Sequence, residues 1–216
     1  MPVYPNHRAI FVNIPKNGGS TLTTMLKRNR FLGRRVNNTD PRCDDCEFVS
    51  QYLDVLGDEA ADYFKFSFAR NPWDRFVSAY HYVCQRRLEM TQVTSHGSFA
   101  EFTSAFSDDP EAFLHIRYFR PQWTYLTDAT GAVPLDFIGR LERFEDDLKV
   151  VLKKIGLRRS LVRRRKQTKR SDFRDYYDDE SRAVIARVYE RDIDLLGYEF
   201  EDGNRRQKTG VLGFLK

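Results

Sequence analysis

The residues at 15–21 are the strongest candidates for chemistry in this chain. They lie between an apolar run that predicts a β-strand over 9–14 and a pattern that predicts a helix. The candidate residues are Lys16, Asn17, Gly18, Gly19, Ser20 and Thr21. Glycines let backbone N–H groups converge on an anion, and the start of a helix adds the positive end of its dipole. The hydroxyls add donors and the lysine a full charge, so the stretch predicts a phosphate cradle.

The order of these residues argues against an ordinary ATP-binding loop. The Walker pattern G-x-x-x-x-G-K-[ST] places its lysine after the glycines, whereas Lys16 precedes Gly18 and Gly19. The alternative interpretation is a strand-to-helix turn in which the glycines serve backbone geometry alone.

A second anion site is predicted further along the chain. The segment 63–70 alternates as a strand does, and Pro72 suits the first turn of the helix expected over 72–87. Arg70 therefore ends a strand, and Ser78 lies about two turns into the helix. An arginine fork and a hydroxyl can bind a second phosphate, which suits a nucleotide with phosphates at both ends.

These motifs are shared with a known family. The chain resembles the sulfotransferases that use 3′-phosphoadenosine 5′-phosphosulfate (PAPS), in the branch that contains carbohydrate sulfotransferases and many bacterial members. The matching segments, in the order of the family, are IFVNIPKNGGST, YFKFSFARNPWDRFVSAY, RPQWTYLTDATGAVPLDFIGRLERFEDDL and RSDFRDYYDDESRAVIARVYERDIDLLGYEF.

The resemblance implies specific roles. The 15–21 loop would hold the 5′-phosphosulfate, with Lys16 on the bridging and sulfuryl oxygens as the main catalytic group. Arg70 and Ser78 would grip the 3′-phosphate, and Arg170 would add a further nucleotide contact. The acceptor would be a hydroxyl, most readily that of a carbohydrate or small molecule. The chemistry needs positioned donors and an in-line attack, and no metal.

A general base would speed the attack of that hydroxyl. Relatives often carry a histidine upstream of the second strand, where this chain has Cys43, Cys46 and Glu47. His115 is our first candidate, because it precedes a segment that in relatives lies near the acceptor. Glu47 and His81 are the alternatives, and His81 could equally be structural.

Two rival functions belong to other classes. A small-molecule kinase would need ATP, Mg²⁺ and a carboxylate to hold the metal, and the position of Lys16 argues against it. A non-catalytic relative that binds the nucleotide would be favoured by the missing upstream histidine.

Charge and cysteine content narrow the possibilities. The net charge of +5 comes from 36 basic and 31 acidic residues, and eight of the basic residues lie in the run from Arg158 to Arg170. Without these eight, 28 basic residues would face 31 acidic ones, and the net charge would be −3. This run could border an anionic ligand or form a solvated loop, and no nucleic-acid-binding module accompanies it. Cys43 and Cys46 form a single C-x-x-C without further ligands, so we expect reduced thiols. Cys84 is expected to be buried in a helix.

The pattern of elements predicts an α/β fold, with a P-loop-like central parallel sheet flanked by helices. A third strand is expected over 135–139, and helices over 20–30 and 47–56. Ser98 and Glu101 predict a capping box. Two further helices show apolar stripes that predict core faces: Phe144, Leu148, Val151, Leu152 and Ile155, ended by Gly156, and Val184, Ile185, Val188 and Tyr189.

The length of 216 residues and the 41% hydrophobic content predict one domain over 1–201, which the resemblance implies is a sulfotransferase domain, followed by a polar, flexible tail over 202–216. No apolar run approaches the ~20 residues that cross a bilayer, and no signal peptide is evident. The expectation is a cytoplasmic enzyme without a membrane span. The oligomeric state is left open.

Overall fold

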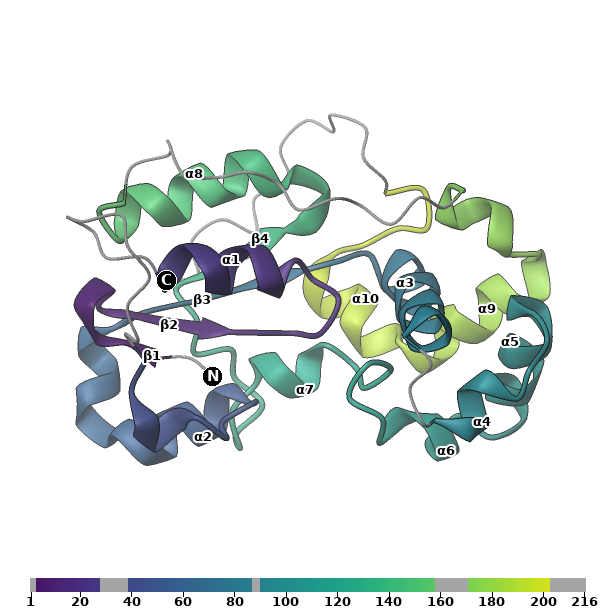
Figure 1. The fold of residues 1–216 in the computed structure, drawn as a ribbon, viewed down its shortest axis with the longest axis horizontal. Coiled ribbons are helices and arrows are strands. Elements are labelled where there is room, and N and C mark those ends of the chain that lie inside the picture. The colour runs from purple at the N-terminus through teal and green to yellow at the C-terminus, as the bar shows by residue number, and fades with distance from the viewer. Residues whose placement is uncertain (1–2, 28–38, 87–89, 158–170, 203–216) are drawn as a thin grey trace. The chain divides into compact units, whose positions relative to one another are not determined.

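The computed structural model of the protein describes residues 3–27, 39–86, 90–157 and 171–202. It falls into two compact units (Figure 1). Unit 1 contains the described residues up to Ala69 together with 122–157, and unit 2 contains those of Arg70–Pro121 together with 171–202. The single domain predicted over 1–201 stays a prediction.

Unit 1 is built on a four-stranded sheet with the order β1-β2-β3-β4. The strands are β1 (Val3–Tyr4), β2 (Ala9–Val12), β3 (Phe64–Ala69) and β4 (Phe137–Arg140). β2 pairs with β3 and β3 with β4 in parallel, as predicted, whereas the short β1 pairs with β2 antiparallel and was not predicted. The fold is thus mixed α/β with a mostly parallel sheet.

One face of the sheet carries aromatic rings in register. Phe11 lies opposite Phe66, which lies opposite Phe137, and the rings of Phe11 and Phe66 stack with centroids 5.2 Å apart. Helices α1 (Gly19–Leu26) and α8 (Phe144–Lys154) cover this face. Figure 1 shows α2 (Val49–Leu56) and α7 (Trp123–Leu126) on the opposite side. The sheet is therefore flanked by helices.

The five apolar residues predicted to form the core face of α8 are all buried, and Gly156 follows the helix with a φ of 69°. α1 ends at Leu26, not near Arg30 as predicted. β4 begins at Phe137, two residues later than expected, although Asp136 already pairs with Lys65 through its N–H.

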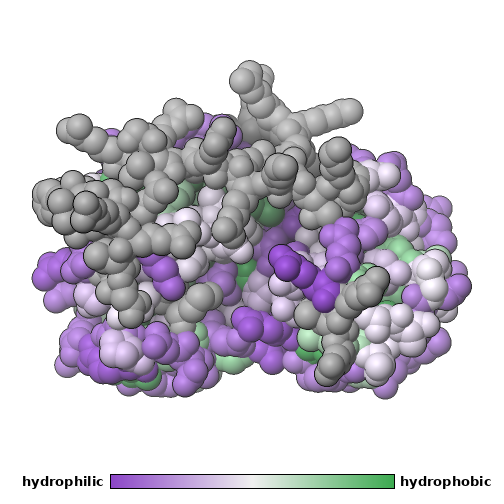
Figure 2. Space-filling model, viewed as in Figure 1, coloured by the Kyte–Doolittle hydropathy of each residue, from purple (hydrophilic) through white to green (hydrophobic). Residues whose placement is uncertain are grey.

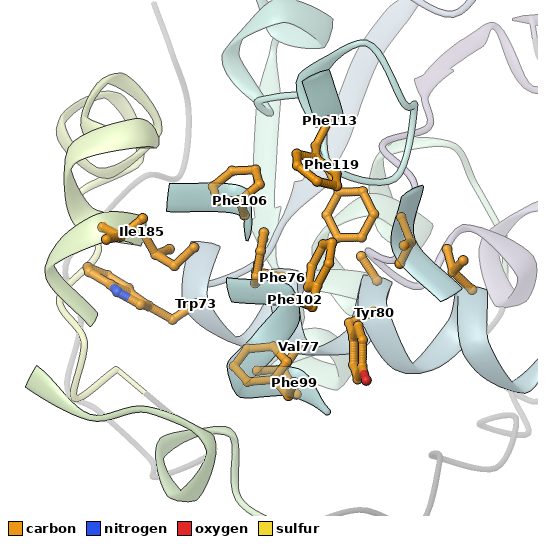
Figure 3. Close-up of a cluster of buried hydrophobic side chains, with 14 of the residues drawn as sticks. Trp73, Phe76, Val77, Tyr80, Phe99, Phe102, Phe106, Phe113, Phe119 and Ile185 are labelled. Carbon is orange, nitrogen blue, oxygen red and sulfur yellow. The ribbon is translucent and has the colours of Figure 1, made fainter. Parts of the chain in front are cut away.

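Unit 2 is helical in its described part. Its elements are α3 (Pro72–Gln85), α4 (Thr91–Thr94), α5 (Phe99–Asp108), α6 (Glu111–Leu114), the 3₁₀ helix η6 (Phe173–Tyr176), α9 (Asp179–Val188) and α10 (Glu190–Leu196). Figure 3 shows its core, in which the ring of Phe76 lies among those of Phe102, Phe106 and Phe119. This aromatic cluster fixes α3, the helix that carries Ser78.

Several sequence predictions need correction here. The last helical stretch is divided into α9 and α10, and Val188 is only half-buried. Cys84 lies in α3 but is likewise half-buried. Asp202, assigned to the flexible tail, is buried and accepts the N–H of Glu199 at 3.0 Å. The rest of the predicted tail lies outside the described residues.

The predicted capping box is only half formed. Ser98 Oγ accepts the N–H of Glu101 at 3.2 Å, as a capping residue should, but Glu101 Oε2 accepts the N–H of Gly97 at 2.8 Å. The carboxylate thus satisfies the donor one residue before the one expected.

The described surface is largely hydrophilic on the face shown in Figure 2. Among the described residues, Val55 is the one large hydrophobic residue classed as exposed. The other large apolar side chains of the described segments are therefore buried or half-buried.

Candidate functional site

The phosphate cradle predicted over 15–21 forms the turn from β2 into α1 (Figure 1). Lys16 has a φ of 74° and Gly18 a φ of 83°, both in the left-handed region. A positive φ is costly for a lysine and free for a glycine, so the loop holds Lys16 in a strained conformation.

Two close approaches explain the glycines. A β-carbon at position 18 would lie 3.0 Å from Leu141 Cδ1, and one at position 19 would lie 1.8 Å from Asn13 Oδ1. The first contact places the loop against the chain between β4 and α8, and the second places the start of α1 against the end of β2. Any larger residue would push the loop away from both.

The backbone of the loop presents donors in a row. Thr21 and Leu22 donate their N–H groups to the Gly18 carbonyl at 3.0 and 3.5 Å. Within the part of the chain that the structure describes, the N–H groups of Gly18, Gly19 and Ser20 have no hydrogen-bond acceptor. Three successive unpaired donors at the N-terminus of a helix are suited to bind an anion. Ser20 is exposed and Thr21 half-buried, so both hydroxyls lie at the rim of the same turn.

Asn17 has a structural contact that its place in the motif did not reveal. Its side chain is buried, and Nδ2 donates to the Phe68 carbonyl at 2.8 Å and to Gln122 Oε1 at 2.7 Å. The sequence predicted a contact between Asn17 and the nucleotide, which stays a prediction. The structure shows that the side chain anchors the loop to β3. Sequence reasoning missed Gln122, which lies 105 residues away without a local signal.

A pair of arginines at the end of β4 was also missed. Arg140 lies opposite Ala69 in the register, and its N–H donates to Asp147 Oδ2 at 2.6 Å. Arg143 Nη2 lies 3.3 Å from Asp147 Oδ1. Burial raises the pKa of Asp147, and the Arg140 N–H and Arg143 oppose this rise. A basic residue directly after a predicted parallel strand was the available signal, because ligands bind at these strand ends.

In unit 2, Arg70 lies two residues before the start of α3, and its Nε donates to Asp74 Oδ2 at 2.8 Å. The helix start is well fixed: Asn71 Oδ1 accepts the N–H of Trp73, and Asn71 Nδ2 donates to the carbonyls of Glu199 and Asp202. Ser78 is half-buried on the same helix. The two predicted 3′-phosphate residues therefore belong to one rigid segment.

The candidate bases lie on different elements. His115 is exposed after α6, with Nε2 3.5 Å from Gln92 Nε2, and its carbonyl accepts Arg120 Nη2. His81 is half-buried in α3, where its ring meets those of Tyr80 and Tyr176. Glu47 lies in unit 1, half-buried before α2. Neither unit brings all three together, and each of them stays a candidate base.

The remaining predictions concern thiols, metals and the basic run. Cys43 and Cys46 are buried and form no disulfide, and burial raises the pKa of Cys43 to about 12, which disfavours the reactive thiolate. The described residues contain no group of three or more His, Cys, Asp or Glu able to hold a metal ion. None of the described helices has both the length and the apolar character to cross a membrane. Arg170 and the run from Arg158 lie outside the described residues.

Comparison with known proteins identifies the family. A sequence model of the Sulfotransferase family matches residues 1–199. No curated protein and no solved structure matches the chain. The matched region includes the 15–21 loop, Arg70, Ser78 and the segment around Arg140. The chain therefore belongs to the sulfotransferase family and has the mixed α/β fold and transferase activity expected of it.

Proposed function

We propose that the protein transfers a sulfuryl group from PAPS to a hydroxyl acceptor, most readily that of a carbohydrate. The observation that carries this proposal is the row of N–H groups of Gly18, Gly19 and Ser20, which have no acceptor within the described residues and begin two positions after Lys16. These donors suit the 5′-phosphosulfate oxygens, with the hydroxyls of Ser20 and Thr21 beside them. The strand–loop–helix order supports a P-loop-like cradle as part of this proposal, although its lysine comes first.

Lys16 has the central chemical role. In the transfer, the acceptor oxygen forms a bond to sulfur while the bond between sulfur and the bridging phosphate oxygen breaks. Negative charge then builds on that bridging oxygen, and the ammonium of Lys16 neutralises it. Because this charge is larger in the transition state than in bound PAPS, Lys16 lowers the barrier more than it strengthens binding.

Arg70 and Ser78 are the proposed ligands of the 3′-phosphate. The guanidinium presents a planar fork of donors, and its Nε bond to Asp74 sets its orientation. Ser78, two turns into α3, adds a hydroxyl donor from the same rigid segment. Arg170 is proposed as a further contact from the basic run. These residues would separate PAPS from nucleotides that lack a 3′-phosphate.

The acceptor proton needs a base, and His115 is our first proposal, with Glu47 and His81 behind it. His115 is exposed, so an acceptor can approach its ring from solvent. The proposed enzyme acts in the cytoplasm and needs no metal, because positioned donors and one lysine supply the charge stabilisation.

The test combines binding with turnover. Isothermal calorimetry should show that 3′-phosphoadenosine 5′-phosphate (PAP) binds far more tightly than ATP, with or without Mg²⁺. Radiolabelled PAPS should then transfer its label to members of a panel of mono- and oligosaccharides. Preference for Mg-ATP would support the kinase instead. PAP binding with no transfer to any sugar, simple alcohol or tyrosine peptide would support the non-catalytic relative.

A further inference from the structure

The contact between Asn17 and Gln122 joins the phosphate cradle to a distant part of unit 1. Both side chains are fully buried, with exposed fractions of 1% and 0%. Asn17 Nδ2 donates one hydrogen to Phe68 O at 2.8 Å and the other to Gln122 Oε1 at 2.7 Å. The Phe68 carbonyl fixes which end of the amide is the donor, because a carbonyl only accepts.

This contact lies beside the one strained residue of the cradle. Lys16, with its φ of 74°, directly precedes Asn17, whose own N–H donates to the Ile14 carbonyl at 3.3 Å. A lysine stays in the left-handed region only where the surrounding structure holds it there. The bonds of Asn17 to Phe68 and Gln122 supply such a restraint one residue away.

We propose that Gln122 is a positioning residue, which clamps Asn17 and so holds Lys16 and the three donor N–H groups in their anion-binding arrangement. The clamp consists of Gln122 Oε1, Asn17 Nδ2 and Phe68 O. Its effect on catalysis rests on the proposed sulfotransferase function, whereas its effect on the loop does not. Gln122 itself touches no reacting atom.

Of the three groups of the clamp, Gln122 is the best target for substitution. The Phe68 acceptor is main chain and remains in every variant. Gln122→Met has nearly the same volume and shape but no acceptor oxygen, so it leaves one buried N–H of Asn17 unpaired. Because a small displacement of a catalytic group is costly, we expect kcat to fall about 10- to 100-fold. KM for PAPS should change less than about threefold, because ground-state binding uses many other donors.

The loop itself gives a readout that needs no nucleotide. Amide hydrogen exchange, followed by NMR, should be about tenfold faster at Asn17, Thr21 and Leu22 in Gln122→Met than in the wild type, because their hydrogen bonds open with the loop. Thr127→Val is the matched control. Thr127 follows the C-terminal end of α7, whereas Gln122 precedes its N-terminal end. The substitution removes the bond of Thr127 Oγ1 to the Trp123 carbonyl and leaves the clamp intact.

The outcomes separate the two proposals. Faster exchange with a fall in kcat in Gln122→Met, and neither in Thr127→Val, supports the clamp. Wild-type exchange and kcat in a folded Gln122→Met overturns it, as does an equal loss in Thr127→Val. If the wild type transfers no sulfate, the proposed function fails, and loop exchange alone decides the clamp. Should Gln122→Met not fold, Asn17→Ala removes the donor side and must show the same two changes, or the clamp is wrong.

Discussion

The side-chain oxygen of Asn13 lies 1.8 Å from the point where a β-carbon of residue 19 would stand. The end of β2 and the first residue of α1 thus touch through a contact that only a glycine permits. The buried Asn13 Oδ1 has no hydrogen-bond partner within the described chain, so Asn13 and Gly19 meet through close packing and not through a hydrogen bond. It sets the angle at which α1 directs its N-terminus, and hence where the Gly19 and Ser20 N–H groups converge.

Gly19→Ala should therefore weaken PAP binding by at least about tenfold, equal to about 1.4 kcal/mol, by calorimetry. The added methyl overlaps Asn13 Oδ1 and Cγ, so the side chain or the helix start must shift. Gly97→Ala is the control, because its added carbon meets only the movable end of Glu101 at 3.3 Å. Combining Gly19→Ala with Asn13→Ala should recover part of the affinity. No recovery would mean that the clash is not the cause.

Lys16→Ala should lower kcat by about 100- to 1000-fold, the range for loss of one group that stabilises developing charge. The dissociation constant of PAP should rise less than about tenfold, about 1.4 kcal/mol, because the backbone donors remain. Steady-state kinetics and calorimetry measure the two effects. Lys153→Ala, exposed in the last turn of α8, controls for the loss of a positive charge. Equal losses in kcat and affinity would argue against the leaving-group role.

The turn from β2 into α1 could be predicted from sequence because its parts are contiguous. The glycines, the hydroxyl residues and the start of α1 lie within a few residues of one another, where local rules apply. The central parallel strands and the stripe of α8 were predicted for the same reason. β1 escaped prediction because two residues carry no periodicity, and its antiparallel pairing with β2 is a tertiary fact.

The contacts that hold the 15–21 loop in place could not be predicted, because they join segments that are distant in the sequence. Asn17 has the residue type of a phosphate ligand, yet its side-chain amide donates hydrogen bonds to Phe68 O and Gln122 Oε1. Only the folded chain brings Gln122 to the loop. Arg140 was within reach of prediction, since a basic residue at the end of a parallel strand is a candidate ligand. The choice among His115, Glu47 and His81 remains a prediction.

Arg70→Ala should mainly abolish discrimination for the 3′-phosphate. The ratio of PAP affinity to AMP affinity should fall about 10- to 100-fold, in line with about 1.5–3 kcal/mol for a hydrogen bond to a charged group. Competition calorimetry with the two nucleotides measures this ratio. Arg187→Ala, exposed on α9 in the same unit, is the control. An unchanged ratio in a folded Arg70→Ala would exclude Arg70 as the 3′-phosphate ligand.

The buried carboxyl of Asp147 should make the free energy of unfolding depend on pH. Burial raises its pKa above the ordinary 3.8, so the folded protein holds a proton there more tightly than the unfolded chain does. The stabilisation from the protonated form is complete below the unfolded pKa and is lost as the pH rises through the folded pKa. The neutral Asp147→Asn keeps an oxygen for the Arg140 N–H and cannot titrate. Its free energy of unfolding should therefore gain on that of the wild type as the pH rises above about 4.

Urea unfolding of both proteins across this pH range measures the difference. Glu145→Gln removes a charge from the same first turn of α8 at an exposed position, and so controls for net charge and for the helix dipole. A difference between Asp147→Asn and the wild type that stays constant or shrinks with rising pH would show that Asp147 is ionised in the fold at no cost. Arg143 and the Arg140 N–H would then outweigh burial, and the end of β4 would be held by a full ion pair.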